Sequence, residues 1–223
     1  MSKLFSNGCS FLTPRPKDGV NTFVSKIISN HYNLKLYNFA KGGRGNDRIS
    51  FTTKVWFESN STEQTFVVIG WSSSLRNDYI TNDGWKLDEI PGDDFSWRSY
   101  NFLKLPTKFY NKIKNFDLDA TSAVRWVNHV IDLQTYFKYK KIPYVMYNAL
   151  PPFIDLKNET FKMLYDKIDH KSFFNFTTSH YDFIVHNNYI VSKDDPHPSN
   201  KGHQVWAEKL IEFINSNELF PLK

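Results

Sequence analysis

Phe66-Val67-Val68-Ile69-Gly70 is the stretch of the sequence that decides the fold. It is an unbroken apolar run that ends at a glycine, and this pattern predicts a short strand buried on both faces. Strands of this kind are typical of parallel sheets that helices cover on both sides. The stretch therefore predicts an α/β domain built around a parallel sheet.

The rest of the chain alternates between strand and helix patterns on either side of this run. Further strands are expected at residues 3–6, 34–39, 142–147, and either 183–185 or 189–191. Helices are expected over residues 20–31 with Asp18 as the N-cap, over 46–57, over 121–139 and over about 199–214. Because no Gly/Ser-rich or Pro-rich linker divides the chain, residues 1–223 are predicted to form one domain.

Composition excludes several classes of protein. The chain has 223 residues, 40% of them hydrophobic, so it is long enough for a real core and is not a disordered chain. No apolar run is long enough to cross a membrane, and the single cysteine excludes an internal disulfide. The net charge of +5 comes from scattered lysines, so we expect no nucleic-acid partner.

The start of the chain and its residue usage bear on location and source. The first residues read as a strand rather than as a secretory signal, so we expect a protein of the cytoplasm or of a virus particle. The abundance of Lys, Asn and Ile beside few Ala is the bias of an AT-rich genome, and a phage is one such source.

Four loops carry the residues with chemical potential. Ligands of parallel sheets bind where the strands end, and three of these loops follow predicted strands while the fourth precedes the last helix. The loops contain Gly8-Cys9-Ser10, Gly42-Gly43-Arg44-Gly45-Asn46, Gly70-Trp71-Ser72-Ser73 and Asp194-Asp195-Pro196-His197-Pro198. A serine at a strand-to-helix turn exposes its hydroxyl, and an acidic residue shortly before a histidine fixes the tautomer of the imidazole. Ser10, His197 and Asp194 are therefore the candidate nucleophile, base and acidic partner, with Asp195 as the alternative to Asp194.

Together the four blocks resemble the SGNH/GDSL hydrolase superfamily. Gly8-Cys9-Ser10 looks like its nucleophile block, Asn38-x-Ala40-x-x-Gly43 like its second block, and Asp194-x-x-His197-Pro198 like its last block. The resemblance implies a flavodoxin-like three-layer sandwich whose five parallel strands have the order 2-1-3-4-5. It also implies ester hydrolysis through an acyl-serine without a metal or organic cofactor. The backbone N–H groups of Ser10 and Gly43 would contribute to the oxyanion hole.

The third block departs from the pattern of that superfamily. It usually reads Gly-x-Asn-Asp, and the Asn side chain is a third oxyanion donor, whereas this chain has Gly70-Trp71-Ser72-Ser73. Three groups are candidates for the missing donor: the Ser72 hydroxyl through a water, the Asn46 amide, and Arg76. We favour Asn46, because its loop already delivers Gly43 and an amide has the right donor character.

Residues 77–120 break the alternation and predict a long insertion or a lid. Its aromatic residues Trp85, Trp97 and Tyr100, with Arg76, are the expected substrate contacts. Flat aromatic faces beside polar groups favour an O-acetylated carbohydrate as substrate, a small molecule or a polysaccharide ester. The alternative is that these aromatics form the small core of the insertion itself.

Two other functions are compatible with the sequence. One is a catalytically weak SGNH-fold module with a binding or structural role, for instance on a virus particle; the other is acyl transfer to an acceptor hydroxyl. The sequence sets no oligomeric state.

Several of the same residues also have structural interpretations. The glycines of the second loop suit a flexible turn, and they lack the Gly-Lys-Ser/Thr ending of a phosphate loop. Cys9 is expected to be a small buried residue, His203 a structural residue of the last helix, and Trp71 and Trp206 packing residues. The spacing of His197 and His203 suits a metal site poorly, so no metal is predicted.

Overall fold

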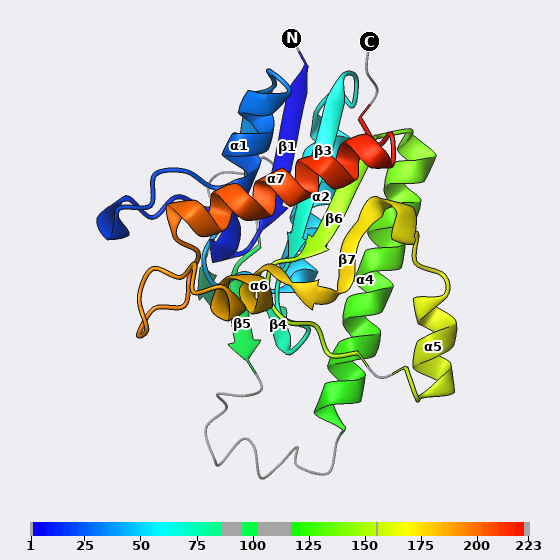
Figure 1. Cartoon of the computed structure of the whole chain (residues 1–223). Helices are drawn as coiled ribbons and strands as arrows, with labels where there is room; N and C mark the ends of the chain where they lie inside the picture. Colours follow the sequence, from blue (N-terminus) through cyan, green and yellow to red (C-terminus); the bar gives the residue numbers. More distant parts are fainter. Residues whose placement is uncertain (1, 86–94, 102–116, 155, 221–223) are drawn as a thin grey trace.

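A computed structural model describes the chain except residues 1, 86–94, 102–116, 155 and 221–223 (Figure 1). It contains a five-stranded parallel sheet with the strand order β2-β1-β3-β6-β7. The strands are β1 (Lys3–Gly8), β2 (Lys35–Asn38), β3 (Thr65–Trp71), β6 (Tyr144–Asn148) and β7 (Phe173–Ser179). Counted along the sheet alone, this is the predicted order 2-1-3-4-5, which is confirmed.

Helices cover both faces of the sheet, as the apolar run in β3 predicts. Phe66 and Val68 pack into the core cluster shared with α1 (Val24–His31), α6 (His180–His186) and α7 (Asn200–Ser216). Val67 and Ile69 point to the other face, into the cluster shared with α2 (Asn46–Ser59), α4 (Leu118–Lys140) and α5 (Glu159–Tyr165). All seven residues of β3 are buried, because successive side chains of a strand point to opposite faces and both faces are covered.

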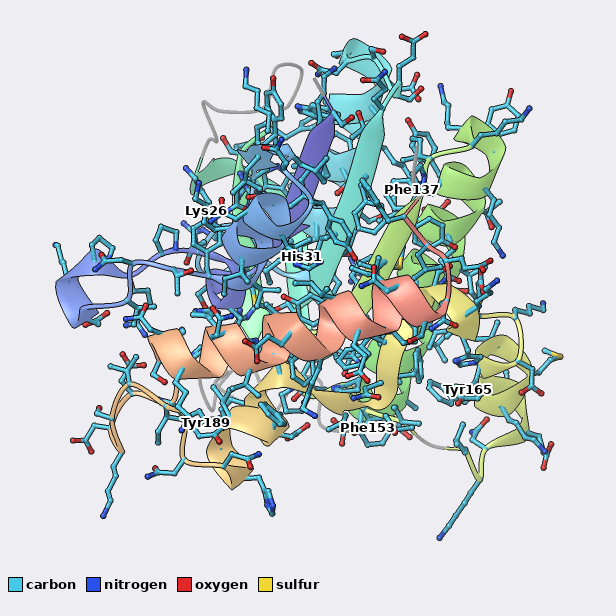
Figure 2. All side chains as sticks on the ribbon, turned by 45° about the horizontal axis from the view of Figure 1, so that its top comes forward. Lys26, His31, Phe137, Phe153, Tyr165 and Tyr189 are labelled. Atoms are coloured by element: carbon cyan, nitrogen blue, oxygen red, sulfur yellow. The ribbon has the colours of Figure 1, made fainter. Side chains whose placement is uncertain are left out.

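Helix α7 crosses the first of these faces. In Figure 2, Lys26 and His31 of α1 lie on one side of α7, and Phe153 and Tyr189 lie on the other. The N-cap Ser199 starts α7 by accepting a hydrogen bond from the Gly202 backbone N–H, close to the predicted start of this helix.

The first helix is shorter than its sequence pattern predicts. Asp18 is not its N-cap: it closes the short 3-10 helix η2 (Pro16–Asp18) and forms an ion pair with Arg15. Gly19 follows with a φ of 72°, a left-handed conformation that ends this turn, and α1 begins only at Val24. Residues 20–23, which the apolar period assigned to the helix, are therefore not helical, and Val20 forms an isolated bridge with Arg15.

The prediction for the fifth strand is wrong. Residues 183–185 lie in helix α6, and Ile190 forms only an isolated bridge with Pro198, whereas β7 comes earlier, at Phe173–Ser179. The reason is local, since Ser179 and Asp182 form a capping box that starts α6 directly after β7.

The described part of the insertion is an antiparallel hairpin of β4 (Arg76–Trp85) and β5 (Trp97–Asn101). It lies beyond the carboxyl ends of the sheet strands in Figure 1. Asp78 attaches it to the start of α2, because one carboxylate oxygen accepts hydrogen bonds from the backbone N–H groups of Gly45, at 2.7 Å, and Arg48, at 3.4 Å. The hairpin is therefore held against the second of the four sequence blocks.

Candidate active site

Ser10 and His197 meet at the carboxyl edge of the sheet. Ser10 follows β1 and opens the 3-10 helix η1 (Ser10–Leu12), while His197 lies in the loop before α7. Their contact joins Ser10 Oγ to His197 Nε2 at 2.9 Å. Ser10 and His197 are 187 positions apart in the sequence, and they meet because β1 and the start of α7 both come to this edge (Figure 1).

The carboxylate that faces His197 belongs to Asp195, which corrects the sequence expectation of Asp194. Asp195 Oδ1 lies 2.6 Å from His197 Nδ1 and also accepts a hydrogen bond from the His197 backbone N–H at 3.2 Å. Asp side chains commonly accept a hydrogen bond from the backbone N–H two residues further along the chain, as Asp195 does here. It fixes Asp195 against the imidazole, whereas Asp194 is exposed.

A carboxylate accepts hydrogen bonds and does not donate them, so His197 Nδ1 carries the proton. His197 Nε2 is then free to accept the proton of the Ser10 hydroxyl. The three side chains form one chain of hydrogen bonds, which is the arrangement that a nucleophile, a base and an orienting acid require.

Arg15 holds the second oxygen of Asp195, a contact that sequence patterns did not indicate. Arg15 Nη2 lies 2.6 Å from Asp195 Oδ2 and 2.9 Å from Asp18 Oδ2. The hydrogen bond from Arg15 holds the pKa of the Asp195 carboxyl far below its usual range, with a further contribution from His197. Asp195 therefore stays ionised and oriented at neutral pH.

The second block lies beside the nucleophile. A Cβ on Gly42 would come within 3.9 Å of Ser10 Cβ, and Gly43 has a φ of 80°, a conformation that favours glycine. Below them, the side chain of Arg44 donates to Asn7 Oδ1 at 2.9 Å, which ties the loop to β1. The glycine loop therefore runs beside Ser10.

Asn46 does not have the role that the sequence favoured. Its Nδ2 donates to the carbonyl oxygens of Ser72, at 3.2 Å, and Ser73, at 3.1 Å, while its Oδ1 accepts from the Ser72 backbone N–H at 2.8 Å. The carboxamide is buried and fully engaged. Asn46 therefore ties the second block to the third and is not the replacement oxyanion donor.

Beneath the nucleophile, Cys9 and Ser72 are both buried, and burial raises the pKa of the Cys9 thiol. The expectation that Cys9 is a small core residue is confirmed. Ser72 Oγ accepts a hydrogen bond from Arg76 Nη1 at 3.2 Å.

A cleft with a volume of about 560 Å³ opens beside Ser10 and His197. Its polar lining is Ser10, His197, Ser73, Ser74 and Arg76. Its apolar walls are Phe11, Leu75, Leu150, Pro151, Pro152, Phe153, Tyr181 and Pro196. Most of these wall residues follow β6 or come from α6, elements from which the sequence analysis singled out no site residue.

The expected aromatic substrate contacts do not form this cleft in the described structure. Trp97 is 4% exposed and packs against Phe51 of α2, with ring centroids 5.5 Å apart, so it belongs to the small core under the hairpin. The side chains of Trp85 and Tyr100 lie outside the described residues. Of the two whose side chains are described, Arg76 lines the cleft and Trp97 does not.

The part of the chain that the structure describes shows neither a metal-binding cluster nor a membrane-spanning helix. It contains no group of three or more His, Cys, Asp or Glu side chains placed to hold a metal ion. None of its helices is long and apolar enough to cross a membrane.

Comparison with known proteins finds structures of similar fold, but the sequence comparisons find no relative. No protein-family model matches the sequence, and no curated protein matches it. Among solved structures, the chain is similar to the psychrotrophic esterase EstA from Pseudoalteromonas sp., with a TM-score of 0.54 and 12% identity over 97% of this chain and 98% of that one. The lipase Lip_vut3 from a goat rumen metagenome gives a TM-score of 0.54 and 14% identity over 96% and 97% of the two chains.

LAE5, an α/β hydrolase enzyme from the metagenome of Lake Arreo in Spain, gives a TM-score of 0.53 and 12% identity over 99% of this chain and 97% of that one. The chain has the fold of the SGNH/GDSL hydrolases, as the four sequence blocks predicted. Identities this low establish the fold, so the chemistry has to be argued from Ser10 and its neighbours.

Two buried histidines lie close to this site. His180 is fully buried and stacks on Trp206, and the ring of His203 lies 5.6 Å from that of His180. Burial lowers the pKa of His203 to about 3, and the charge of His197 adds to this effect. The expectation of a structural role for His203 agrees with its burial in the first turn of α7.

The low pKa of His203 makes stability depend on pH. The unfolded chain protonates this histidine near pH 6.5, whereas the folded chain resists protonation until about pH 3. Between these values the unfolded state binds more protons, so stability falls as the pH decreases, by up to about 1.4 kcal/mol per pH unit. Above about pH 6.5 the effect of this group is constant.

We predict that His203→Gln flattens the pH dependence of the free energy of unfolding between about pH 4 and 6, the window set by these two pKa values. The measurement is urea unfolding at a series of pH values, with His186→Gln, at an exposed position of α6, as the matched control. A wild-type slope retained in His203→Gln would contradict the assignment.

Proposed function

We propose that this protein is a serine ester hydrolase that works through an acyl-serine intermediate. The observation that carries the proposal is the continuous chain from Ser10 Oγ through His197 to Asp195, with contacts of 2.9 Å and 2.6 Å at the edge of a cleft. A binding module without activity has no need for a nucleophile, a base and an ionised orienting acid in this geometry.

The geometry supports the following reaction sequence. Ser10 Oγ attacks the ester carbonyl carbon while His197 Nε2 takes the hydroxyl proton. His197 then returns this proton to the departing alcohol oxygen, which leaves the acyl group on Ser10. A water molecule, deprotonated by the same nitrogen, attacks the acyl-serine carbonyl carbon. His197 then returns this proton to Ser10 Oγ as the bond to the acyl group breaks, which releases the acid and restores the serine. Asp195 stabilises the imidazolium that forms at each step, and Arg15 keeps Asp195 in position.

The backbone N–H groups of Ser10 and Gly43 are the proposed first two donors to the tetrahedral oxyanion. Their support is the position of Ser10 at the start of η1 and the approach of the glycine loop to its side chain.

The walls of the cleft favour esters with an apolar acyl or alcohol portion. Leucine, proline and phenylalanine side chains line the space away from Ser10, and the Phe153 backbone N–H donates to Ser74 Oγ at 2.9 Å, which fixes one wall to the third block. Deacetylation of a carbohydrate stays a prediction of the sequence, because the aromatic residues that favoured it are either buried or outside the described residues.

We predict that Ser10→Ala and His197→Ala each lower kcat by a factor of about 10³ or more on a p-nitrophenyl ester, since triad members act as a unit. The double variant should lose little beyond either single one. Wild-type protein should also be labelled on Ser10 by a fluorophosphonate, with the site identified by mass spectrometry. Hydrolysis by Ser10→Ala at near wild-type rates would show that Ser10 is not the nucleophile.

The two adjacent aspartates provide a matched pair. Asp195→Asn should lower kcat by a factor of about 10²–10⁴, because the amide no longer fixes the imidazole tautomer. Asp194→Asn, at the exposed neighbouring position, should stay within about threefold of wild type. The assignment of Asp195 fails if these two variants exchange ranks.

Substrate choice is predicted from the cleft. In a panel of acetate, butyrate and octanoate p-nitrophenyl esters beside acetylated xylo-oligosaccharides, kcat/KM should be higher for butyrate than for acetate, by roughly tenfold or more for two methylenes in an apolar site. A clear preference for the acetylated sugars would instead support the carbohydrate prediction. Product analysis with added alcohols separates hydrolysis from acyl transfer.

A further inference from the structure

We propose that the guanidinium of Arg76 is the third donor of the oxyanion hole, in the place of the asparagine that the third block lacks. The inference rests on the proposed ester hydrolysis and adds a catalytic residue to it. It concerns an arginine from the start of the insertion hairpin, outside the four sequence blocks.

The other two candidate donors are less suited to this role. The Asn46 carboxamide has both its oxygen and its nitrogen engaged with the backbone of Ser72 and Ser73. Ser72 is 1% exposed, and its hydroxyl accepts the hydrogen bond from Arg76. The Arg76 guanidinium therefore lies between this hydroxyl and the cleft. Ser72 itself does not line the cleft, whereas Arg76 does.

Arg76 occupies the space next to the position from which an asparagine would reach the oxyanion. Its Nη1 lies 3.2 Å from Ser72 Oγ, and Arg76 lines the same cleft as Ser10 and His197. Its charge also reaches the residue beside the nucleophile: burial raises the pKa of Cys9, and the cationic charge of Arg76 acts in the opposite direction. The guanidinium is thus close to both the first and the third block.

The backbone of Arg76 is fixed on two sides. Its N–H donates to the Ser73 carbonyl at 3.0 Å, and a Cβ on Gly45 would come within 2.7 Å of its carbonyl oxygen, which shows how closely the second block packs against it. A donor held this way needs little reorganisation when charge develops on the substrate.

The charge of Arg76 is available to a substrate. Among the described residues, no carboxylate lies within ion-pair distance of Arg76, whereas Arg15 and Arg125 pair with Asp195 and Asp47. A guanidinium has five N–H donors, and the structure engages one of them with Ser72 Oγ. Charge-assisted hydrogen bonds are about twice as strong as neutral ones, so a cation is an effective substitute for an amide.

The first test separates transition-state stabilisation from substrate binding. Arg76→Ala should lower kcat by a factor of about 10²–10³ on uncharged p-nitrophenyl esters and change KM by no more than about threefold, as expected for the loss of one oxyanion donor. Arg76→Lys should keep an intermediate rate, because the ammonium retains the charge but not the planar fork.

The second test is rescue by the missing side chain. Ser72→Asn in the Arg76→Ala background should recover at least about tenfold in kcat, because it restores a neutral donor at the usual position. Ser59→Asn in the same background is the control and should recover nothing, since Ser59 is exposed at the end of α2 and does not line the cleft. Circular dichroism and Tm of each variant verify that it folds.

The outcomes distinguish this inference from the proposed function. If Ser10→Ala is inactive while Arg76→Ala keeps its kcat, the protein is a serine hydrolase and the role of Arg76 is wrong. A rise in KM at constant kcat, or a loss confined to esters with an anionic group, would make Arg76 a substrate-binding residue and overturn the inference. Hydrolysis by Ser10→Ala at near wild-type rates would overturn both proposals, because an oxyanion donor needs the acyl-serine chemistry.

Discussion

The parallel pairing of β1 with β2 on one side and β3 on the other is the constraint on which the site depends. Gly8 lies opposite Gly70 in this register, so the chain leaves both central strands at the same level. A Cβ on Gly8 would come within 2.7 Å of the Gly70 carbonyl oxygen, which leaves room only for glycine unless the backbone shifts. Ser10 follows two residues later and enters the edge where the other loops meet.

Buried polar side chains then hold these loops in register. Asn7 Oδ1 accepts from Arg44, Asn46 binds the backbone of Ser72, and Asp78 accepts from the Gly45 N–H. Each of these groups is buried, and a buried polar group is costly unless it is hydrogen-bonded. The network therefore disfavours displaced arrangements of the second block, the third block and the hairpin, and it keeps their backbone groups near Ser10.

Charge is arranged on both sides of the nucleophile. Arg15 neutralises and orients Asp195 behind the imidazole, at 2.6 Å, while Arg76 faces the cleft beside Ser72. The first arginine has two carboxylates close to it, and the second has none among the described residues. Two residues of the same type thus have different roles because of what surrounds them.

The sequence by itself indicated the α/β class and the candidates Ser10 and His197, while the strand order followed from the resemblance of the four blocks to the SGNH/GDSL hydrolases. The continuous apolar run of β3 and the residue types around Ser10 and His197 are local patterns. A local pattern can be recognised in one sequence because it does not depend on contacts between distant residues. The sequence did not determine the extent of α1, the position of β7, the choice of Asp195 over Asp194 or the role of Asn46. Those depend on contacts between residues far apart in the chain, such as Asn46 with Ser72 and Arg15 with Asp195, or on capping and turn geometry that competes with periodicity. Only the tertiary structure decides between side chains of equal chemical suitability, because hydrogen bonding depends on distances of a few tenths of an ångström that composition and spacing do not encode.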